Sequence, residues 1–139
     1  TKGSPMNKQL ATRVIAWHTD NGGFCSTYSD YQTHALRLLH EATGLCLACG
    51  ATQEQIFEVG SDEINKHAER YASGEIVFEG IGEEIADVAI LLEVLAYYTN
   101  NPIDLHVDTK LDVLHNRLWT ADAHGVLWRR KDGDEEAAQ

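Results

Sequence analysis

The chain has 139 residues, of which 43% are hydrophobic and 24% charged, with only 11 glycines and two prolines. This length and composition suit one globular domain and exclude a disordered, collagenous or low-complexity chain. No apolar run approaches the roughly 20 residues that span a bilayer, and no signal peptide is recognised, so we expect a soluble, cytoplasmic protein without a membrane partner.

The charge balance narrows the choice of ligand. Asp and Glu number 22 against 11 Lys and Arg, which gives a formal net charge of −11. Nucleic-acid binders usually present a basic face, so we expect no nucleic-acid partner. A small phosphorylated ligand remains compatible with an acidic chain if divalent cations lie between the carboxylates and the phosphates.

The three cysteines indicate a reducing compartment, because they are few and odd in number. Cys46 and Cys49 have the spacing of a C-x-x-C pair but lie in an apolar helical pattern. They are predicted to be small core residues one turn apart. A zinc or redox pair is the alternative.

The ends of the chain are predicted to lie outside the fold. Residues 1–5, ahead of Met6, read as an expression scar. Residues 6–130 are expected to form a single helical domain, and residues 131–139 a disordered acidic tail.

Apolar periodicity then predicts the elements in chain order. The second helix is expected to begin at a cap, Ser29 or Asp30, and to end at Gly50. The third helix carries an expected interruption at Gly60 and Ser61, and residues 76–78 could be extended. Five helices are predicted in all, over residues 7–18, 29–49, 52–71, 83–98 and 104–119.

Strand signals are almost absent, so the predicted fold class is all-α, a bundle of about five helices. The helix over residues 83–98 is apolar on nearly all sides and is expected to be central. Because four short partners cannot cover it, we expect a homo-oligomer.

Acidic residues within apolar helix faces are the most informative feature. Glu41 has Leu38 three residues before it and Leu45 four residues after it. Asp87 lies in a similar apolar setting, and Glu84 precedes it by three residues, so both point to one side of the helix. An unpaired buried carboxylate costs several kcal/mol, so acids in this pattern favour a divalent metal site between helices.

The same helix holds acids with a simpler explanation. Glu83 and Glu84 fall in its predicted first turn, where carboxylates stabilise the positive dipole end regardless of function. Glu93 has no acidic companion at ligand spacing and is expected at a subunit interface or in solvent.

Two motifs in order carry a resemblance to a known family. The sequence Glu-Glu-Ile-Ala-Asp-Val at residues 83–88, with Arg-Leu-Leu-His-Glu at residues 37–41, resembles the MazG-like all-α nucleotide pyrophosphohydrolases. The family pattern is a Glu-Glu-x-x-Glu helix, a spacer and a Glu-x-x-Asp helix. The likeness extends over residues 32–119, where residues 110–119 are similar to the closing helix of the family, and it is nearest to phage-encoded members.

The resemblance implies an oligomeric hydrolase, a dimer or tetramer, that converts a nucleoside triphosphate to the monophosphate and pyrophosphate. A purine deoxynucleotide such as dGTP or dATP is the first expectation, and the host cytoplasm the expected location. Catalysis and Mg²⁺ or Mn²⁺ binding would fall to Glu41, Glu84 and Asp87, with the general base left open. The expected substrate-binding residues are Arg37, Lys110, Asn116 and Arg117 for the phosphates, and Trp17 and His34 for the base.

One departure from the family pattern bears on activity. The first motif reads His40-Glu41-Ala42-Thr43-Gly44, so two of its three acids are missing and Gly44 supplies no ligand. Such a site could bind fewer metals or be inactive, leaving a helical oligomer that binds nucleotide or a protein partner. A ferritin-like di-metal bundle is a third interpretation, although only Asp112 and His115 approach its Glu-x-x-His pattern. Alternatively, the site could take an acid from the spacer: Glu54, Glu58, Glu63 or Glu69.

Overall fold

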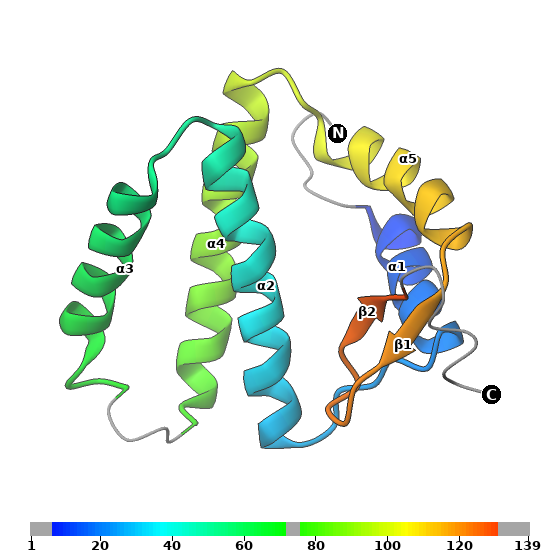
Figure 1. The fold of residues 1–139 in the computed structure, drawn as a ribbon, viewed down its shortest axis with the longest axis horizontal. Helices are drawn as coiled ribbons and strands as arrows, with labels where there is room; N and C mark the ends of the chain where they lie inside the picture. The colour runs from blue at the N-terminus through cyan, green and yellow to red at the C-terminus, as the bar shows by residue number, and fades with distance from the viewer. Residues whose placement is uncertain (1–6, 72–75, 131–139) are drawn as a thin grey trace.

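The structure is a computed structural model that describes residues 7–71 and 76–130. The predicted expression scar at residues 1–5 and the predicted acidic tail at residues 131–139 lie outside this part of the chain. The described residues form five helices and one hairpin (Figure 1). These elements are α1 (Lys8–Asp20), α2 (Tyr28–Ala48), α3 (Gln53–His67), α4 (Phe78–Tyr98), α5 (Ile103–His115), β1 (Trp119–Ala121) and β2 (Leu127–Arg129).

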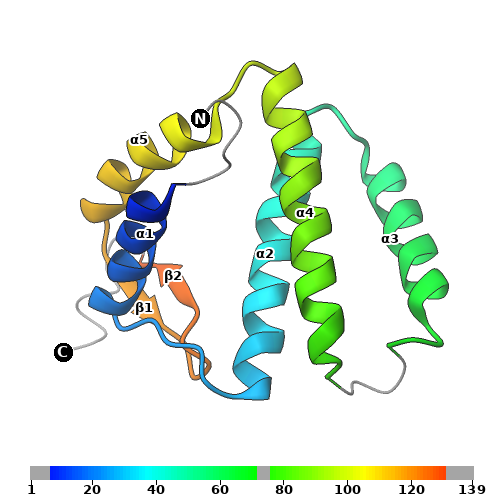
Figure 2. The ribbon, with the colours of Figure 1, turned by 180° about the vertical axis from the view of Figure 1, so that it is seen from behind.

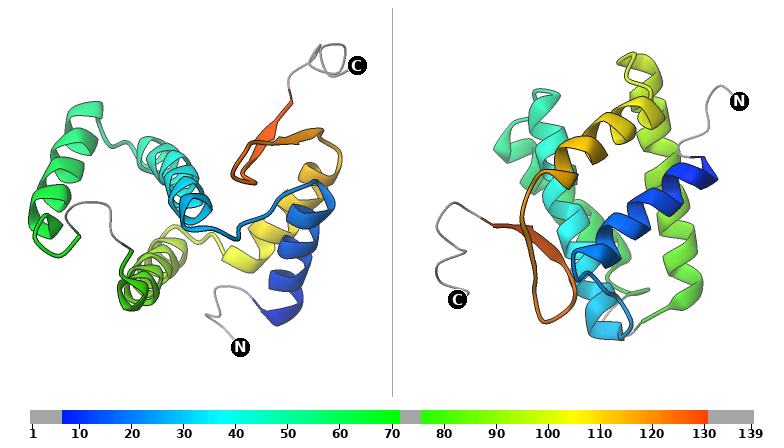
Figure 3. Two further views of the ribbon diagram at one scale, coloured as in Figure 1. Left: turned by 90° about the horizontal axis from the view of Figure 1, so that it is seen from below. Right: turned by 90° about the vertical axis from the view of Figure 1, so that its right-hand side faces the viewer.

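The elements gather in two groups. In Figure 1 and, from behind, in Figure 2, helices α2, α3 and α4 lie on one side, while α1, α5 and the hairpin lie on the other. Helices α1 and α5 pack against each other (Figure 3). The predominance of helix confirms the predicted class, and no helix in the described part of the chain is both long and apolar enough to cross a membrane.

Helix caps set most boundaries. The hydroxyl of Thr27 accepts a hydrogen bond from the backbone N–H of Asp30, whose side chain accepts one from the N–H of Thr27. This capping box starts α2 at Tyr28, one or two residues before the predicted start. Thr52 caps α3 in the same way with Gln55, and α3 continues through the interruption that was predicted at Gly60.

Three helix boundaries were predicted wrongly, and the first is the end of α3, which lies at His67 rather than at residue 71. Helix α4 begins at Phe78 rather than at residue 83, so its first turns include Gly80. A Cβ at Gly80 would lie 2.6 Å from the hydroxyl oxygen of Tyr71, and glycine therefore lets Tyr71 lie against the start of α4. Helix α5 ends at His115, where the amide of Asn116 donates to the backbone oxygen of Asp112, and the chain then leaves the helix.

The β1–β2 hairpin was not predicted. Its strands pair antiparallel, with Thr120 opposite Trp128. One carboxylate oxygen of Asp122 accepts from the backbone N–H groups of His124 and Val126, at 2.8 and 3.1 Å, and the other accepts from the indole N–H of Trp128 at 2.9 Å. Gly125 takes a φ of +77°, which favours glycine. Asp122 therefore organises the turn.

The core of the described residues is small and lies with α1, α5 and the hairpin. Its members include Leu10, Leu111, Val126 and Leu127. Helix α4 buries only Gly80 and Ala96, so most of its apolar surface is exposed in the single chain. The reason is that no described element covers most of its apolar surface. Cys25, Cys46 and Cys49 are exposed and free, which contradicts the predicted core role of the last two.

Asp30 ties the start of α2 to the hairpin. Only 3% of this residue is exposed. Its Oδ2 accepts from the backbone N–H groups of Ser26 and Thr27, both at 2.9 Å, and its Oδ1 lies 3.1 Å from Nδ1 of His124. The backbone N–H bonds, and then the bond with His124, hold the pKa of Asp30 well below its usual range.

The Asp30 bonds make stability depend on pH. Because the folded pKa is depressed, the stabilisation is complete above about pH 4 and is lost as the pH falls toward the folded pKa. We expect Asp30→Ala to lower the melting temperature by several degrees at about pH 7, and the difference from the wild type to shrink as the pH is lowered to about 3. Asp20→Asn, at the exposed end of α1, is the control, and thermal unfolding followed by circular dichroism is the measurement. An unchanged difference at low pH would contradict the role assigned to the carboxylate.

Candidate functional site

A cavity of about 510 Å³ lies between α1, α2, α5 and the hairpin. This volume is within the usual range for small-molecule sites. Apolar residues from three elements form part of its wall: Leu38, Leu114, Val126 and Leu127. The remaining lining residues are cationic or aromatic, with one acid, Glu41.

Four cationic side chains line this cavity and come from different segments. Arg37 belongs to α2, Lys110 to α5, Arg117 to the turn after α5, and Arg129 to β2. They are four of only 11 Lys and Arg in a chain with a net charge of −11. A concave wall with cations from several directions concentrates positive potential, which suits an anionic ligand.

Arg37 is held in place by its neighbours. Its Nη1 donates to Oε1 of Glu41 at 2.7 Å, one helical turn away. Its guanidinium lies over the ring of Trp128, with Cζ 4.8 Å from the ring centroid, and the Trp128 ring also meets that of His40 at 5.6 Å. An arginine fixed by stacking and an ion pair loses little freedom when it binds an anion.

Glu41 is exposed, with 73% of its side chain accessible. The burial that its apolar neighbours predicted is therefore not found, although residues of α1, α5 and the hairpin line the same cavity. Its carboxylate stands at the cavity wall beside the cation of Arg37. A carboxylate so placed retains lone pairs for a further hydrogen bond or a cation.

Aromatic rings form the inner part of the wall. Trp17 and Trp119 meet edge to face, with centroids 5.1 Å apart, and His18 meets His34 at 5.5 Å. Burial lowers the pKa of His18, and the neighbouring His34 acts in the same direction, while a hydrogen bond with the backbone of Gly125 opposes both. His18 is thus held toward its neutral form.

The structure brings together most of the residues predicted for the site. Residues from α1, α2 and the α5 region meet around the same cavity: Trp17, His34, Arg37, Glu41, Lys110 and Arg117. Asn116 does not line it, because its amide caps the end of α5. His18 also lines it.

The other two predicted metal ligands lie elsewhere. Glu84 and Asp87 are on α4, which contributes no residue to the cavity. Glu84 accepts a hydrogen bond from the hydroxyl of Tyr71 at 3.4 Å, and Asp87 is exposed. Residues 7–71 and 76–130 of one chain contain no cluster of three or more His, Cys, Asp or Glu that could hold a metal ion.

Sequence reasoning missed the contribution of the hairpin. Arg129, Val126 and Leu127 line the cavity, as does Trp119 at the start of β1. The sequence does contain a hairpin pattern, but the pattern is short. Aromatic and β-branched residues flank the segment from Asp122 to Gly125, a pattern typical of a hairpin with a glycine in its loop.

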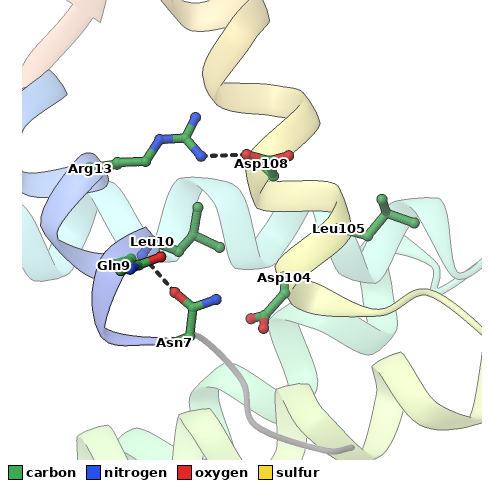
Figure 4. A pocket seen from close by; sticks show the side chains of 7 residues that line it. All are labelled: Asn7, Gln9, Leu10, Arg13, Asp104, Leu105 and Asp108. Atoms are coloured by element: carbon green, nitrogen blue, oxygen red, sulfur yellow. Dashed lines mark hydrogen bonds and ion pairs between the residues drawn. The ribbon is translucent and has the colours of Figure 1, made fainter. Parts of the chain in front are cut away.

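A second cavity, of about 310 Å³, lies between the start of α1 and the start of α5 (Figure 4). Arg13 is paired with Asp108 across it, and Asn7 caps α1 by accepting from the N–H of Leu10 at 2.8 Å. Asp104 belongs to the first turn of α5, where an acid is favoured by the helix dipole. The ion pair of Arg13 and Asp108 therefore joins the two helices.

Comparison with known proteins identified no relative of this chain. No family model, curated protein or solved structure matches this chain. Any function is therefore argued from the cavity and from the motifs.

The cationic wall predicts an anion site that can be tested without assuming a reaction. We expect Lys110→Gln, Arg117→Gln and Arg129→Gln each to weaken binding of inorganic tripolyphosphate about tenfold, since each removes a charge-assisted hydrogen bond worth about 1.5 kcal/mol. The measurement is isothermal titration calorimetry. Lys66→Gln, on α3, makes the same change of charge away from the cavity. Equal weakening by Lys66→Gln would show that only net charge matters.

Proposed function

We propose that this protein is a metal-dependent nucleoside triphosphate pyrophosphohydrolase, which cleaves a nucleotide to its monophosphate and pyrophosphate. The observation that carries the proposal is the cavity that gathers cations from four segments beside aromatic rings and Glu41. A nucleoside triphosphate has the matching parts, an anionic tail and a planar base. A purine deoxynucleotide, dGTP or dATP, is the first substrate to test.

In this proposal different cavity residues bind different parts of the substrate. Lys110, Arg117 and Arg129 offset the charge of the phosphates, and Arg37 can grip two phosphate oxygens with its planar fork. The rings of Trp17 and Trp119 form an apolar wall for the base. Water then breaks a phosphoanhydride bond, its proton passing to a carboxylate that the proposal leaves open.

The proposal includes Mg²⁺ or Mn²⁺ held by Glu41, Glu84 and Asp87. Their oxygens are the hard ligands that these ions prefer, and Glu84 and Asp87 are one turn apart on α4. A bound ion would polarise the attacked phosphoryl group. Since Glu41 does not cluster with the other two in one described chain, the metal site requires α2 and α4 to be brought together by assembly.

Exposed apolar side chains support an assembly, a dimer or tetramer. Leu91 on α4 is 68% exposed, and Phe57 and Ile64 on α3 are 64% and 73% exposed. Large apolar residues are also exposed along α2, among them Leu39 and Leu47. Apolar surface of this extent on neighbouring helices is typical of an interface.

A second candidate is a catalytically impaired oligomer that binds nucleotide or a protein partner without hydrolysis. Gly44, which supplies no ligand where the family pattern has an acid, favours it. Nothing lies within 4 Å of where a Cβ at Gly44 would be, so the glycine is not needed for packing in the single chain. The two candidates differ in whether nucleotide and Mn²⁺ together yield pyrophosphate.

The carboxylates provide the test of hydrolysis. With each common ribo- and deoxyribonucleoside triphosphate and Mg²⁺ or Mn²⁺, chromatography is expected to find monophosphate and pyrophosphate. Glu41→Gln, Glu84→Gln and Asp87→Asn should each reduce pyrophosphate release at least about 100-fold, with the helical circular dichroism unchanged. Asp62→Asn, an exposed neutralisation on α3, is the control. Normal hydrolysis by Asp87→Asn would overturn the site, and diphosphate with orthophosphate would overturn the reaction.

Assembly is tested separately. Light scattering is expected to give the mass of a dimer or tetramer for the wild type and a lower mass for Leu91→Glu, because a charge cannot be buried against a second copy without a partner. Thr12→Glu, on the exposed side of α1, adds the same charge away from α2, α3 and α4. A monomeric wild type would contradict the assembly.

A further inference from the structure

Two polar atoms of the cavity residues have no hydrogen-bond partner in the described structure. They are Nε1 of Trp17 and Nε2 of His34, both buried. Buried polar groups in folded proteins are nearly always hydrogen-bonded, so these two atoms are available to bond with a ligand or with water. The residues come from different helices, α1 and α2, and line the same cavity.

The chemistry of the two atoms differs. Nδ1 of His34 lies 2.8 Å from the backbone oxygen of Asp30, which can only accept, so Nδ1 carries the proton. Nε2 of the neutral ring is then an acceptor. The indole N–H of Trp17 can only donate. Two residues that line the cavity therefore carry one donor and one acceptor without a partner in the described structure.

We propose that these two atoms recognise the nucleobase of the substrate, which deepens the proposed function and rests on it. The Trp17 N–H donates to a carbonyl oxygen or ring nitrogen of the base, and Nε2 of His34 accepts from an amino group or ring N–H. Ionised phosphate oxygens are acceptors only, so they cannot satisfy Nε2 of a neutral His34 ring.

A sugar hydroxyl can donate and accept, but the surroundings favour a planar base. The ring of Trp17 stands edge to face with that of Trp119, and Leu38 and Leu114 line the same cavity. Such a wall suits a flat aromatic group. Each common base carries hydrogen-bond donors and acceptors on its edge. Trp17 and His34 therefore orient a base without selecting one of the four.

Trp119 provides a matched contrast. Its indole N–H donates to the backbone oxygen of Leu114 at 3.0 Å, so it is already satisfied. Trp17→Phe and Trp119→Phe thus make the same chemical change in the same cavity, but only the first removes an available donor.

The experiment measures binding to the full chain by calorimetry with Mg²⁺ present. The ligands are the α,β-methylene analogues of dGTP and dATP, the base-free 2-deoxyribose 5-triphosphate, and inorganic tripolyphosphate. Trp17→Phe is expected to weaken binding of both base-bearing analogues about tenfold while leaving the base-free ligands unchanged. Trp119→Phe removes the same ring area but no available donor, so it is expected to weaken the base-bearing analogues much less than Trp17→Phe does.

Variants of His34 test the acceptor. His34→Phe should weaken base-bearing ligands selectively, and His34→Gln, whose amide oxygen can accept, should restore part of the loss. Each variant is compared across all ligands. A variant that fails to fold would lose affinity for every ligand, which distinguishes it from a variant that loses only base recognition. The melting temperature of each variant is measured in parallel.

Each other outcome overturns the inference. Equal weakening of 2-deoxyribose 5-triphosphate would assign the two atoms to the sugar, and equal weakening of tripolyphosphate would assign them to the phosphates. No change with any ligand would show that neither atom contributes. The bond between the α- and β-phosphates of the nucleotide analogues cannot be hydrolysed, so their binding is measured independently of catalysis. Absence of pyrophosphate release from natural substrates would therefore count against the proposed function and not against base recognition.

Discussion

The bonds of Asp30 connect helix capping, the hairpin and the cavity. Its carboxylate completes the capping box of α2 and reaches His124 in the hairpin loop, while its backbone oxygen fixes the ring of His34. The backbone N–H of Phe24 bonds to the oxygen of Gly125 beside it, at 3.3 Å. The cavity lies between the two elements that these bonds join, so its shape depends on a residue that does not line it. An almost fully buried carboxylate is tolerated here because donors meet both of its oxygens.

The sequence predicted the helices better than it predicted the segment after α5. Apolar periodicity and capping residues such as Thr52 are local signals, and the helices they indicated are present. The strands of the hairpin have three residues each, too few for alternation to be recognised, and their stability depends on Asp122 bonding across the turn. The helical pattern in the sequence continues through Asn116 and Arg117. In the structure, however, Asn116 caps α5, which ends at His115.

The residues that line the cavity were predicted only in part, because local sequence patterns do not show how distant segments meet. Residue types that bind phosphate could be identified as Arg37, Lys110 and Arg117, and these share one cavity. Arg129 could not be identified without the hairpin, which brings it back toward α2. The burial of Glu41 was inferred from its helical neighbours, but amphipathic spacing shows only that a face is apolar. Whether that face is covered depends on tertiary and quaternary contacts, which spacing does not contain.

The exposed face of α4 links stability to chemistry. It carries apolar residues such as Leu91 together with Glu84 and Asp87, whereas the cationic cavity is built without α4. A metal ion between phosphates and carboxylates needs both sets of charges in one place, since cations alone hold a triphosphate without activating it. Burying the apolar face of α4 against other helices would also move its two acids out of water. Because an unpaired buried carboxylate is costly, such an assembly gains most if a cation enters with them. Under the proposed function, assembly and metal binding would therefore reinforce each other, and Mn²⁺ with nucleotide would raise the stability of the oligomer more than either does alone.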